Sequence, residues 1–275
     1  MKRWVLLAIL SILAAATCRA QQVPNAPIGT TQGNSEEGPP KASSMTPREI
    51  ALMRADILMA RKDYGEAAKA YLDILKSEPN NAELLNKTGL AYQLVGDPDQ
   101  SERYYKKSIH ADKKSSSAIN NLGTLEFGRD RFGKAIKDYK RAIEIGDNLA
   151  TMYSNLGYAY CGIKAYPKAT EAFNKALALD PDVFERKGSG GSIVQQRSAN
   201  DPGALHFLVA KSYAKIGDAE HTARYLKMAR DEGYKNVVSA QTDPEFAKVI
   251  KDPRVQEVLH VRPPYAAEPP KPVQN

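Results

Sequence analysis

The chain has 275 residues, of which 42% are hydrophobic and 26% charged, enough to form one or two folded soluble domains. Its formal net charge is +7, and about +4 once three basic residues of a predicted leader are removed. Lys and Arg are mixed with acidic residues throughout and are not interleaved with aromatic residues. This composition excludes a typical nucleic-acid-binding surface.

Residues 1–20 have the pattern of an export signal. Lys2 and Arg3 precede the run WVLLAILSILAAA, which is uncharged and mostly apolar. This run is too short to span a bilayer, which needs about 20 apolar residues. We expect cleavage after Ala20, which places a mature chain starting at Gln21 in the periplasm or outside the cell. The later sequence contains no segment long and apolar enough to form a transmembrane helix.

A lipoprotein signal is an alternative interpretation of the same segment, because Cys18 follows the apolar run. The usual bacterial lipobox has a leucine-like residue three positions before its cysteine and Gly, Ala or Ser directly before it. Here Ala15 and Thr17 occupy those positions. A lipid anchor at Cys18 therefore remains the less favoured alternative. Cys161 is the other cysteine, and it has no internal disulfide partner once Cys18 is removed or modified.

Residues 21–46 are predicted to be a disordered linker. They are rich in Pro, Gly and Ser and contain few large apolar residues, so burial cannot repay the entropy of ordering them. At the end of this linker, Thr46 is expected to cap the first helix. Pro47 suits the first helical position, and Glu49 would complete a capping box.

The segment 150–181 predicts two short amphipathic helices separated by a break at 162–166. Shifting this unit back by 34 residues three times aligns it with earlier parts of the chain. The first helix of each unit has a small residue in one column: Gly157, Gly123, Gly89 and Ala55. The second helix has a small residue in another column: Ala169, Ala135, Ser101 and Ala67. Its aromatic column is Phe173, Tyr139, Tyr105 and Tyr71.

These columns make residues 48–183 similar to the tetratricopeptide repeat (TPR) family. Small residues allow two helices to approach closely, and bulky neighbours fill the space against the next unit. The resemblance implies an all-α fold, a right-handed TPR superhelix or α-solenoid of about five helix-turn-helix repeats with a C-terminal helical cap. Two positions depart from the family pattern: Glu126 replaces a usual tyrosine and Arg54 a usual leucine.

The chain is therefore expected to contain several successive segments after the linker. Four contiguous repeats would occupy 47–183, as units 48–81, 82–115, 116–149 and 150–183. They would be followed by a Gly-rich insertion at 184–202, a fifth TPR-like repeat at 203–233, capping helices at 234–260 and a disordered Pro-rich tail at 261–275. One capping helix is expected to begin at Asp243 and another at Asp252.

The sequence predicts no catalytic residue, metal site or cofactor. It contains no G-x-S-x-G elbow, P-loop or H-E-x-x-H motif, and no two histidines are three or four positions apart. The glycines at 188–191 lack the GK[ST] that a phosphate loop requires. An accessory enzyme with its chemistry in the 184–202 insertion is the disfavoured alternative from another class.

In the TPR family, a partner binds in a concave groove formed mainly by the first helices of the repeats. The corresponding positions combine amide side chains with apolar and aromatic ones, which suits an extended segment or a helix of a protein partner. They are Asn86, Leu90, Gln93, Asn120, Thr124, Phe127, Ser154, Tyr158, Phe207 and Lys211.

The family's two-carboxylate clamp for acidic C-terminal tails is not supported, because its positions hold mostly Leu, Asn and Ser. The predicted function is a non-enzymatic protein–protein interaction scaffold outside the cytoplasm. A lipidated envelope-assembly or secretion-accessory factor is the alternative.

Overall fold

The computed structural model describes residues 45–146, 149–185 and 201–260, and every regular element in these ranges is a helix. The predicted leader, most of the linker, residues 186–200 of the insertion and the tail lie outside the described residues.

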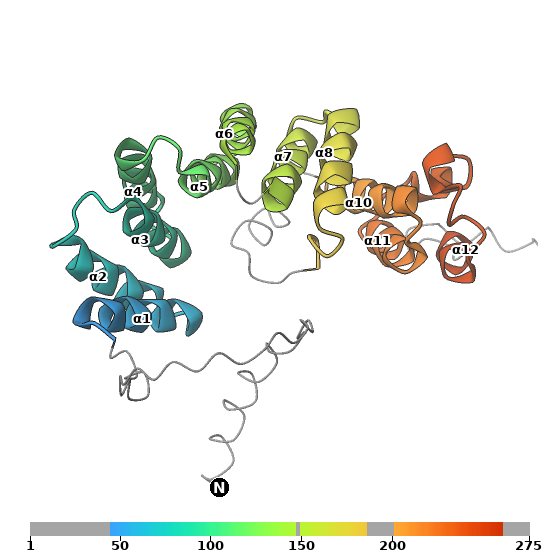
Figure 1. Ribbon diagram of the computed structural model, residues 1–275. Coiled ribbons are helices and arrows are strands. Elements are labelled where there is room, and N and C mark those ends of the chain that lie inside the picture. Colours follow the sequence, from blue (N-terminus) through green and yellow to red (C-terminus); the bar gives the residue numbers. More distant parts are fainter. Residues whose placement is uncertain (1–44, 147–148, 186–200, 261–275) are drawn as a thin grey trace, which may run out of the picture. The chain divides into compact units, whose positions relative to one another are not determined.

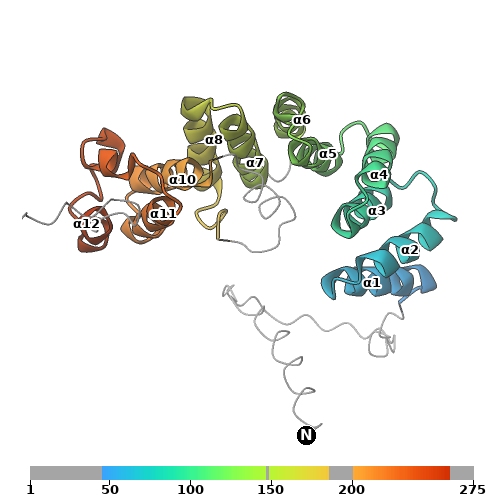
Figure 2. The same ribbon diagram turned by 180° about the vertical axis from the view of Figure 1, so that it is seen from behind.

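The described residues form five consecutive helix pairs followed by a cap (Figure 1). The pairs are α1 (Pro47–Ala60) with α2 (Tyr64–Leu75), α3 (Ala82–Val95) with α4 (Pro98–Ala111), α5 (Ser116–Gly128) with α6 (Phe132–Ile145), α7 (Leu149–Gly162) with α8 (Tyr166–Leu179), and α10 (Pro202–Ile216) with α11 (Ala219–Asp231). Each helix packs against the next one along the chain, which can be followed from both sides in Figures 1 and 2. This arrangement confirms the predicted all-α repeat solenoid.

The predicted columns of small and aromatic residues explain how the helices of each pair approach. An added Cβ atom at Gly157 would lie 2.3 Å from the ring of Phe173. At Gly123 it would lie 2.9 Å from the ring of Tyr139, and Gly89 has the same relation to Tyr105 at 2.7 Å. Each glycine therefore provides space for an aromatic ring from the second helix of its own pair. A larger side chain would push the pair apart.

The predicted start of the folded region is confirmed at atomic detail. The Thr46 hydroxyl accepts a hydrogen bond from the Glu49 backbone N–H at 3.2 Å, and the Glu49 carboxylate accepts from the Thr46 N–H at 2.7 Å. Pro47 occupies the first turn of α1. This capping box satisfies N–H groups that a helix start leaves without intrahelical partners.

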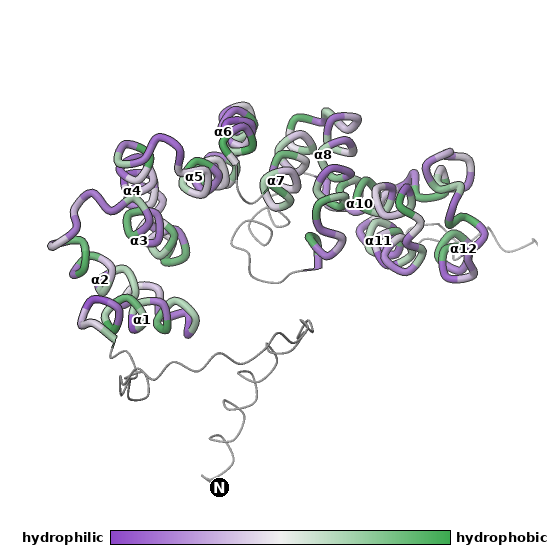
Figure 3. The backbone as a smooth tube through the Cα atoms, in the orientation of Figure 1, coloured by the Kyte–Doolittle hydropathy of each residue, from purple (hydrophilic) through white to green (hydrophobic). Residues whose placement is uncertain are grey.

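Buried apolar side chains form one large cluster in the C-terminal part and two smaller clusters before it. The large cluster extends from Phe127 to Leu259 and includes residues of every helix from α7 to α12. One smaller cluster joins α1, α2 and α3, and the other contains Ile119, Ala142 and Met152. Figure 3 shows how polar and apolar residues alternate around the successive helices that supply these clusters.

The turn at 181–185 joins the fourth pair to the fifth. Phe184 is buried there, with its ring centroid 5.4 Å from that of Phe173 and 6.0 Å from that of Tyr213. Edge-to-face contacts of this kind stabilise beyond the burial of apolar area. The core thus continues from α8 to α10 through a residue outside the repeat period.

The cap differs from the prediction of two helices. Asp243 does cap a segment, since its carboxylate accepts from the Glu245 N–H at 3.0 Å, but this segment is only a 3-10 turn, Pro244–Phe246. Another 3-10 turn, Val237–Gln241, precedes it, and only α12 (Pro253–His260) is α-helical. Pro253 explains the missing α-helix. It disfavours helical conformation at Asp252, so a helix that begins at Pro244 has too few residues to offset the cost of nucleation.

Candidate functional site

The ten predicted groove residues differ in their accessibility. Four are half-buried: Asn86, Leu90, Gln93 and Lys211. The other six are buried, with at most 8% of their surface exposed: Asn120, Thr124, Phe127, Ser154, Tyr158 and Phe207. The predicted residues on α5 and α7, together with Phe207 on α10, are therefore buried instead of lining an accessible surface.

Aromatic neighbours explain the burial on α5 and α7. Tyr158 contacts Phe173 and Phe184, with ring centroids 5.4 and 6.4 Å away. Phe127 packs edge-to-face on Phe132 at 5.2 Å. These aromatic side chains belong to the core instead of an exposed binding surface.

The cap covers the corresponding face of α10. The ring of Phe207 lies 5.0 Å from that of Tyr234 and 5.6 Å from that of Phe246. The Lys211 ammonium lies 2.7 Å from the Asp243 carboxylate and 3.2 Å from that of Glu245. The chain's own residues 243–246 thus occupy the surface that was predicted to bind a partner.

The first helices of the first two pairs, α1 and α3, keep this surface accessible, and we call it the α1–α3 face. It contains three residues at equivalent positions on each helix, all of them half-buried: Leu52, Asp56, Met59, Asn86, Leu90 and Gln93. The three residues on α1 were missed by the sequence analysis. The same 34-residue shift that aligned the repeats places them directly before their counterparts on α3.

Hydrogen bonds hold the polar residues of the α1–α3 face in place. The Asp56 carboxylate accepts from the Tyr71 hydroxyl at 2.5 Å and lies 3.0 Å from the Lys87 ammonium. Burial raises the pKa of Tyr71, and its hydrogen bond to Asp56 raises it further, so the phenol stays a donor at neutral pH. Asp56 therefore connects the first helix pair to the second and is not an unpaired charge.

The amide of Gln93 is oriented in the same way. Its Oε1 atom accepts from the hydroxyl of Tyr105 at 2.7 Å. Its NH₂ group donates no hydrogen bond to any of the described residues. A fixed amide with a free donor can recognise a backbone carbonyl without a large loss of side-chain entropy.

A network of four asparagines extends from this face toward the core. Asn121 donates to the side-chain oxygen of Asn86 at 3.0 Å, and Asn155 donates to that of Asn120 at 2.9 Å. A longer contact of 3.5 Å joins Asn120 to Asn121. The network fixes the Asn86 amide and leaves its NH₂ group available as a donor.

The α1–α3 face presents apolar side chains and oriented amides. Among residues 45–146, 149–185 and 201–260, no group of three or more His, Cys, Asp and Glu residues is arranged to hold a metal ion. Burial raises the pKa of Cys161 to about 12, so this thiol carries almost no nucleophilic thiolate at neutral pH. In the same ranges, none of the helices is both long and apolar enough to cross a membrane.

The fold is that of a helical-repeat scaffold of the kind that mediates protein–protein interactions. The four helix pairs from α1 to α8 match family models of the tetratricopeptide repeat. Models described as "Tetratricopeptide repeat" match residues 52–112 and 115–182.

Two relatives illustrate the similarity. The chain is 25% identical over 235 residues to Hsp70-Hsp90 organizing protein 3 of Arabidopsis thaliana, covering 79% of this chain and 39% of the relative. It is 26% identical over 182 residues to tetratricopeptide repeat protein 8 of Caenorhabditis elegans, covering 66% and 35%. The chain thus spans well under half the length of either relative.

Solved structures are similar in fold. The structure described as "Functional Characterization of Pseudomonas Aeruginosa pilF" superposes with a TM-score of 0.50 at 18% identity, covering 77% of this chain and 86% of the other. That of MamA has 27% identity and a TM-score of 0.45, covering 66% and 95%. The first similarity supports the helical-repeat fold.

Proposed function

We propose that the protein is a non-enzymatic scaffold that binds an extended segment of a partner protein on the α1–α3 face. The observation that carries this proposal is a difference in exposure among equivalent positions. Asn86, Leu90 and Gln93 on α3 are half-buried, whereas their three counterparts on α5 and two of the three on α7 are buried. A segment that binds here competes with no described part of the chain.

The spacing of the α3 residues suits an extended backbone. Asn86 and Gln93 are seven positions apart, so their Cα atoms are separated by about 10.5 Å along one side of the helix. Three residues of an extended chain cover about the same distance. The two amides can therefore bond to backbone groups of one segment, while Leu90 contacts a side chain between them.

The charges favour a neutral or apolar segment over an acidic tail. Lys87, which follows Asn86 on α3, already pairs with Asp56. Leu52 and Met59 supply further apolar contacts from α1, and the flexible thioether of Met59 can adapt to different side chains. The partner segment should therefore be extended, with apolar side chains that contact α1 and α3 and with backbone groups that are free to bond to the two amides.

Photo-crosslinking tests this proposal in living cells. A benzophenone amino acid replaces Leu90 in one variant and Leu179, an exposed residue at the end of α8, in a control. We expect a discrete adduct at position 90 that disappears when Asn86 and Gln93 are also changed to alanine. The same adducts at both positions, or adducts that survive the alanine changes, would show that the α1–α3 face does not select the partner.

We also propose that the scaffold acts outside the cytoplasm. The support is the amino-terminal sequence, with Lys2 and Arg3 before an apolar run and a small residue, Ala20, at the expected cleavage site. Mass analysis of the protein from the cell envelope and medium should find an unmodified terminus at Gln21. A diacylglyceryl group on Cys18 would instead favour the lipidated assembly factor, and an intact Met1 would contradict export.

A further inference from the structure

Helix α1 exposes an unusual amount of apolar surface. Its sequence, PREIALMRADILMA, is apolar on most sides, yet Ala55 is its only buried residue. Ile50, Met53 and Ile57 are 49%, 44% and 49% exposed. Helices that are apolar on most sides are normally covered, and contiguous apolar patches on a soluble protein mark interaction sites.

The repeat pattern identifies what is missing. Residues one, two and three repeats after Ile50 are Leu84, Ala118 and Met152, and each is at most 2% exposed. In each case the second helix of the preceding pair packs against the helix that carries the residue: α2 on α3, α4 on α5 and α6 on α7. Ile50 is the same column in the pair that has no described predecessor. Within residues 45–146, 149–185 and 201–260, no helix covers α1 on the side of Ile50.

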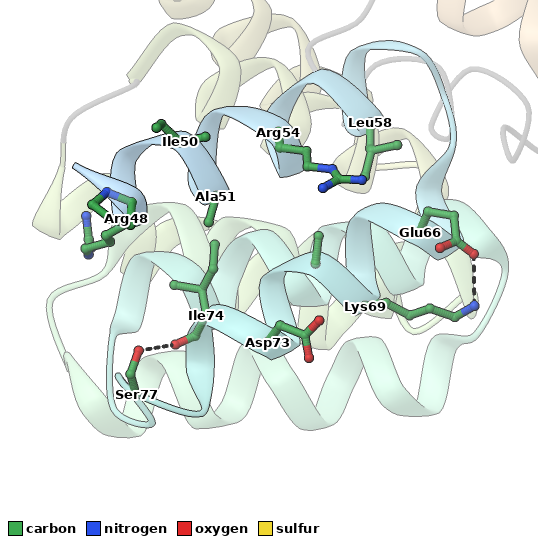
Figure 4. Close-up of a pocket in the computed structure, with 12 residues that line it drawn as sticks. Arg48, Ile50, Ala51, Arg54, Leu58, Glu66, Lys69, Asp73, Ile74 and Ser77 are labelled. Atoms are coloured by element: carbon green, nitrogen blue, oxygen red, sulfur yellow. Dashed lines mark hydrogen bonds and ion pairs between the residues drawn. The ribbon is translucent and has the colours of Figure 1, made fainter. Parts of the chain in front are cut away.

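A groove between α1 and α2 adjoins this surface (Figure 4). It has a volume of about 820 Å³. Figure 4 shows Arg54 and Leu58 on α1 facing Asp73 and Ile74 on α2 across the opening. We define the α1 docking face by its residues, which span about 160° of the helix at 100° per residue: Ile50, Ala51, Met53, Arg54, Ile57 and Leu58.

We propose that a second copy of this chain covers the α1 docking face, with α1 of each copy packed against the groove of the other. A helix that covers α1 must present a wide apolar side to it. Helix α1 of a second copy meets this requirement, because it has an uncovered apolar side. Residues 21–46 contain four prolines and few large apolar residues, so their sequence lacks the wide apolar side that a covering helix needs. In a two-fold symmetric dimer both copies contribute the same surface to the interface, so the α1 docking face needs no second, different surface as its partner.

The charges of the groove permit this pairing. Arg48, Arg54 and Lys69 are nearly balanced by Glu66 and Asp73, so two copies would repel each other only weakly. Arg54 has no ion-pair partner among the described residues. Its long side chain can lie along the apolar surface while its guanidinium reaches a carboxylate of the other copy.

Analytical ultracentrifugation of the purified chain tests the proposal. The wild-type chain should form a dimer at micromolar concentration, and Met53→Glu should weaken it roughly tenfold or more, which corresponds to about 1.4 kcal/mol. Val95→Glu is a matched control, because Val95 is 51% exposed on α3 and is not part of the docking face. A monomeric wild-type chain, or a dimer unaffected by Met53→Glu, would overturn the proposal.

Disulfide trapping examines the geometry independently of affinity. Arg54 lies near the middle of the α1 docking face both along and around the helix, so it lies near its own copy at the two-fold axis whether the helices are parallel or antiparallel. In a background with Cys18→Ser and Cys161→Ala, Arg54→Cys should give a disulfide-linked dimer under mild oxidation and Val95→Cys should not. Equal cross-linking of both variants would contradict the proposed interface. Neither measurement requires the partner of the α1–α3 face, so this proposal can fail separately from the proposed function.

Discussion

The N-terminal half, α1 to α4, and the C-terminal half, α7 to α12, use the same repeat but bury very different amounts of apolar surface. From Phe127 at the end of α5, one cluster of buried apolar residues extends through Phe184 to Leu259 in α12. In the first pair, α1 buries only Ala55 and leaves large apolar side chains exposed. Nearest-neighbour packing governs the stability of such repeats, so a pair that lacks one neighbour also lacks part of its stabilisation.

This difference separates a part with a continuous apolar core from the part on which we propose that a partner binds. In the C-terminal half, Phe184 and residues 243–246 cover side chains that would otherwise line a binding surface. The N-terminal half has no equivalent covering segment among its described residues, and its amides remain accessible. Local opening should also be easiest where buried apolar contacts are fewest.

Gly157→Leu should cause the largest loss of stability. A Cβ atom at this position already lies 2.3 Å from the Phe173 ring, so the added side chain must separate α7 from α8. We expect a loss above the usual overpacking range of about 1–3 kcal/mol in the free energy of unfolding. Thermal and urea unfolding would measure it.

Gly133→Leu is the matched control for this change. A Cβ atom at Gly133 meets nothing within 4 Å, so leucine fits without displacing a neighbour. We expect its melting temperature to stay close to that of the wild type. Equal destabilisation by both changes would mean that the glycine column does not determine the helix crossing.

Phe184→Ala should destabilise the C-terminal half by about 3 kcal/mol, the lower end for removing a buried phenylalanine. It also opens the space between Phe173 and Tyr213, which hold its ring at 5.4 and 6.0 Å. Hydrogen exchange should therefore quicken in α8 and α10 together. Faster exchange confined to residues 181–185 would show that this aromatic residue does not join the fourth pair to the fifth.

Gly89→Leu tests the same clash in the less stable half. Its Cβ atom would lie 2.7 Å from the Tyr105 ring, so α3 and α4 should separate. Because the N-terminal core is a separate cluster, we expect exchange to quicken from α1 to α4 and to stay slow in α10 and α11. Uniformly faster exchange would contradict the division into two halves.

The smallest effect concerns pH. Hydrogen bonds from Lys106 and Arg129 lower the pKa of Glu102 from 4.5 to about 2. Because the folded-state pKa is the lower one, this stabilisation is present above about pH 4.5 and is lost as pH falls toward 2. Glu102→Gln should cost up to about 1 kcal/mol at neutral pH and nothing near pH 2, measured by urea unfolding. A constant difference across this range would contradict the proposed ion-pair origin.

The repeat period was sufficient to predict the helix pairs, because each column of small or aromatic residues reports a contact within a pair. The capping box at Thr46 was also predictable, since its partners are three residues apart. The burial of Tyr158 and Phe207 was not predictable in this way. It depends on Phe184 and Phe246, which lie outside the period and reach their contacts through turns.

The central claim is that the α1–α3 face, and not the corresponding face of α10, binds the partner. The most direct test is the affinity of the partner captured at position 90, measured by titration calorimetry for two variants. We predict at least a tenfold loss for the double variant Asn86→Ala and Gln93→Ala, with an unchanged melting temperature, and no loss for Lys211→Gln. Full affinity in the double variant together with a loss in Lys211→Gln would contradict the claim.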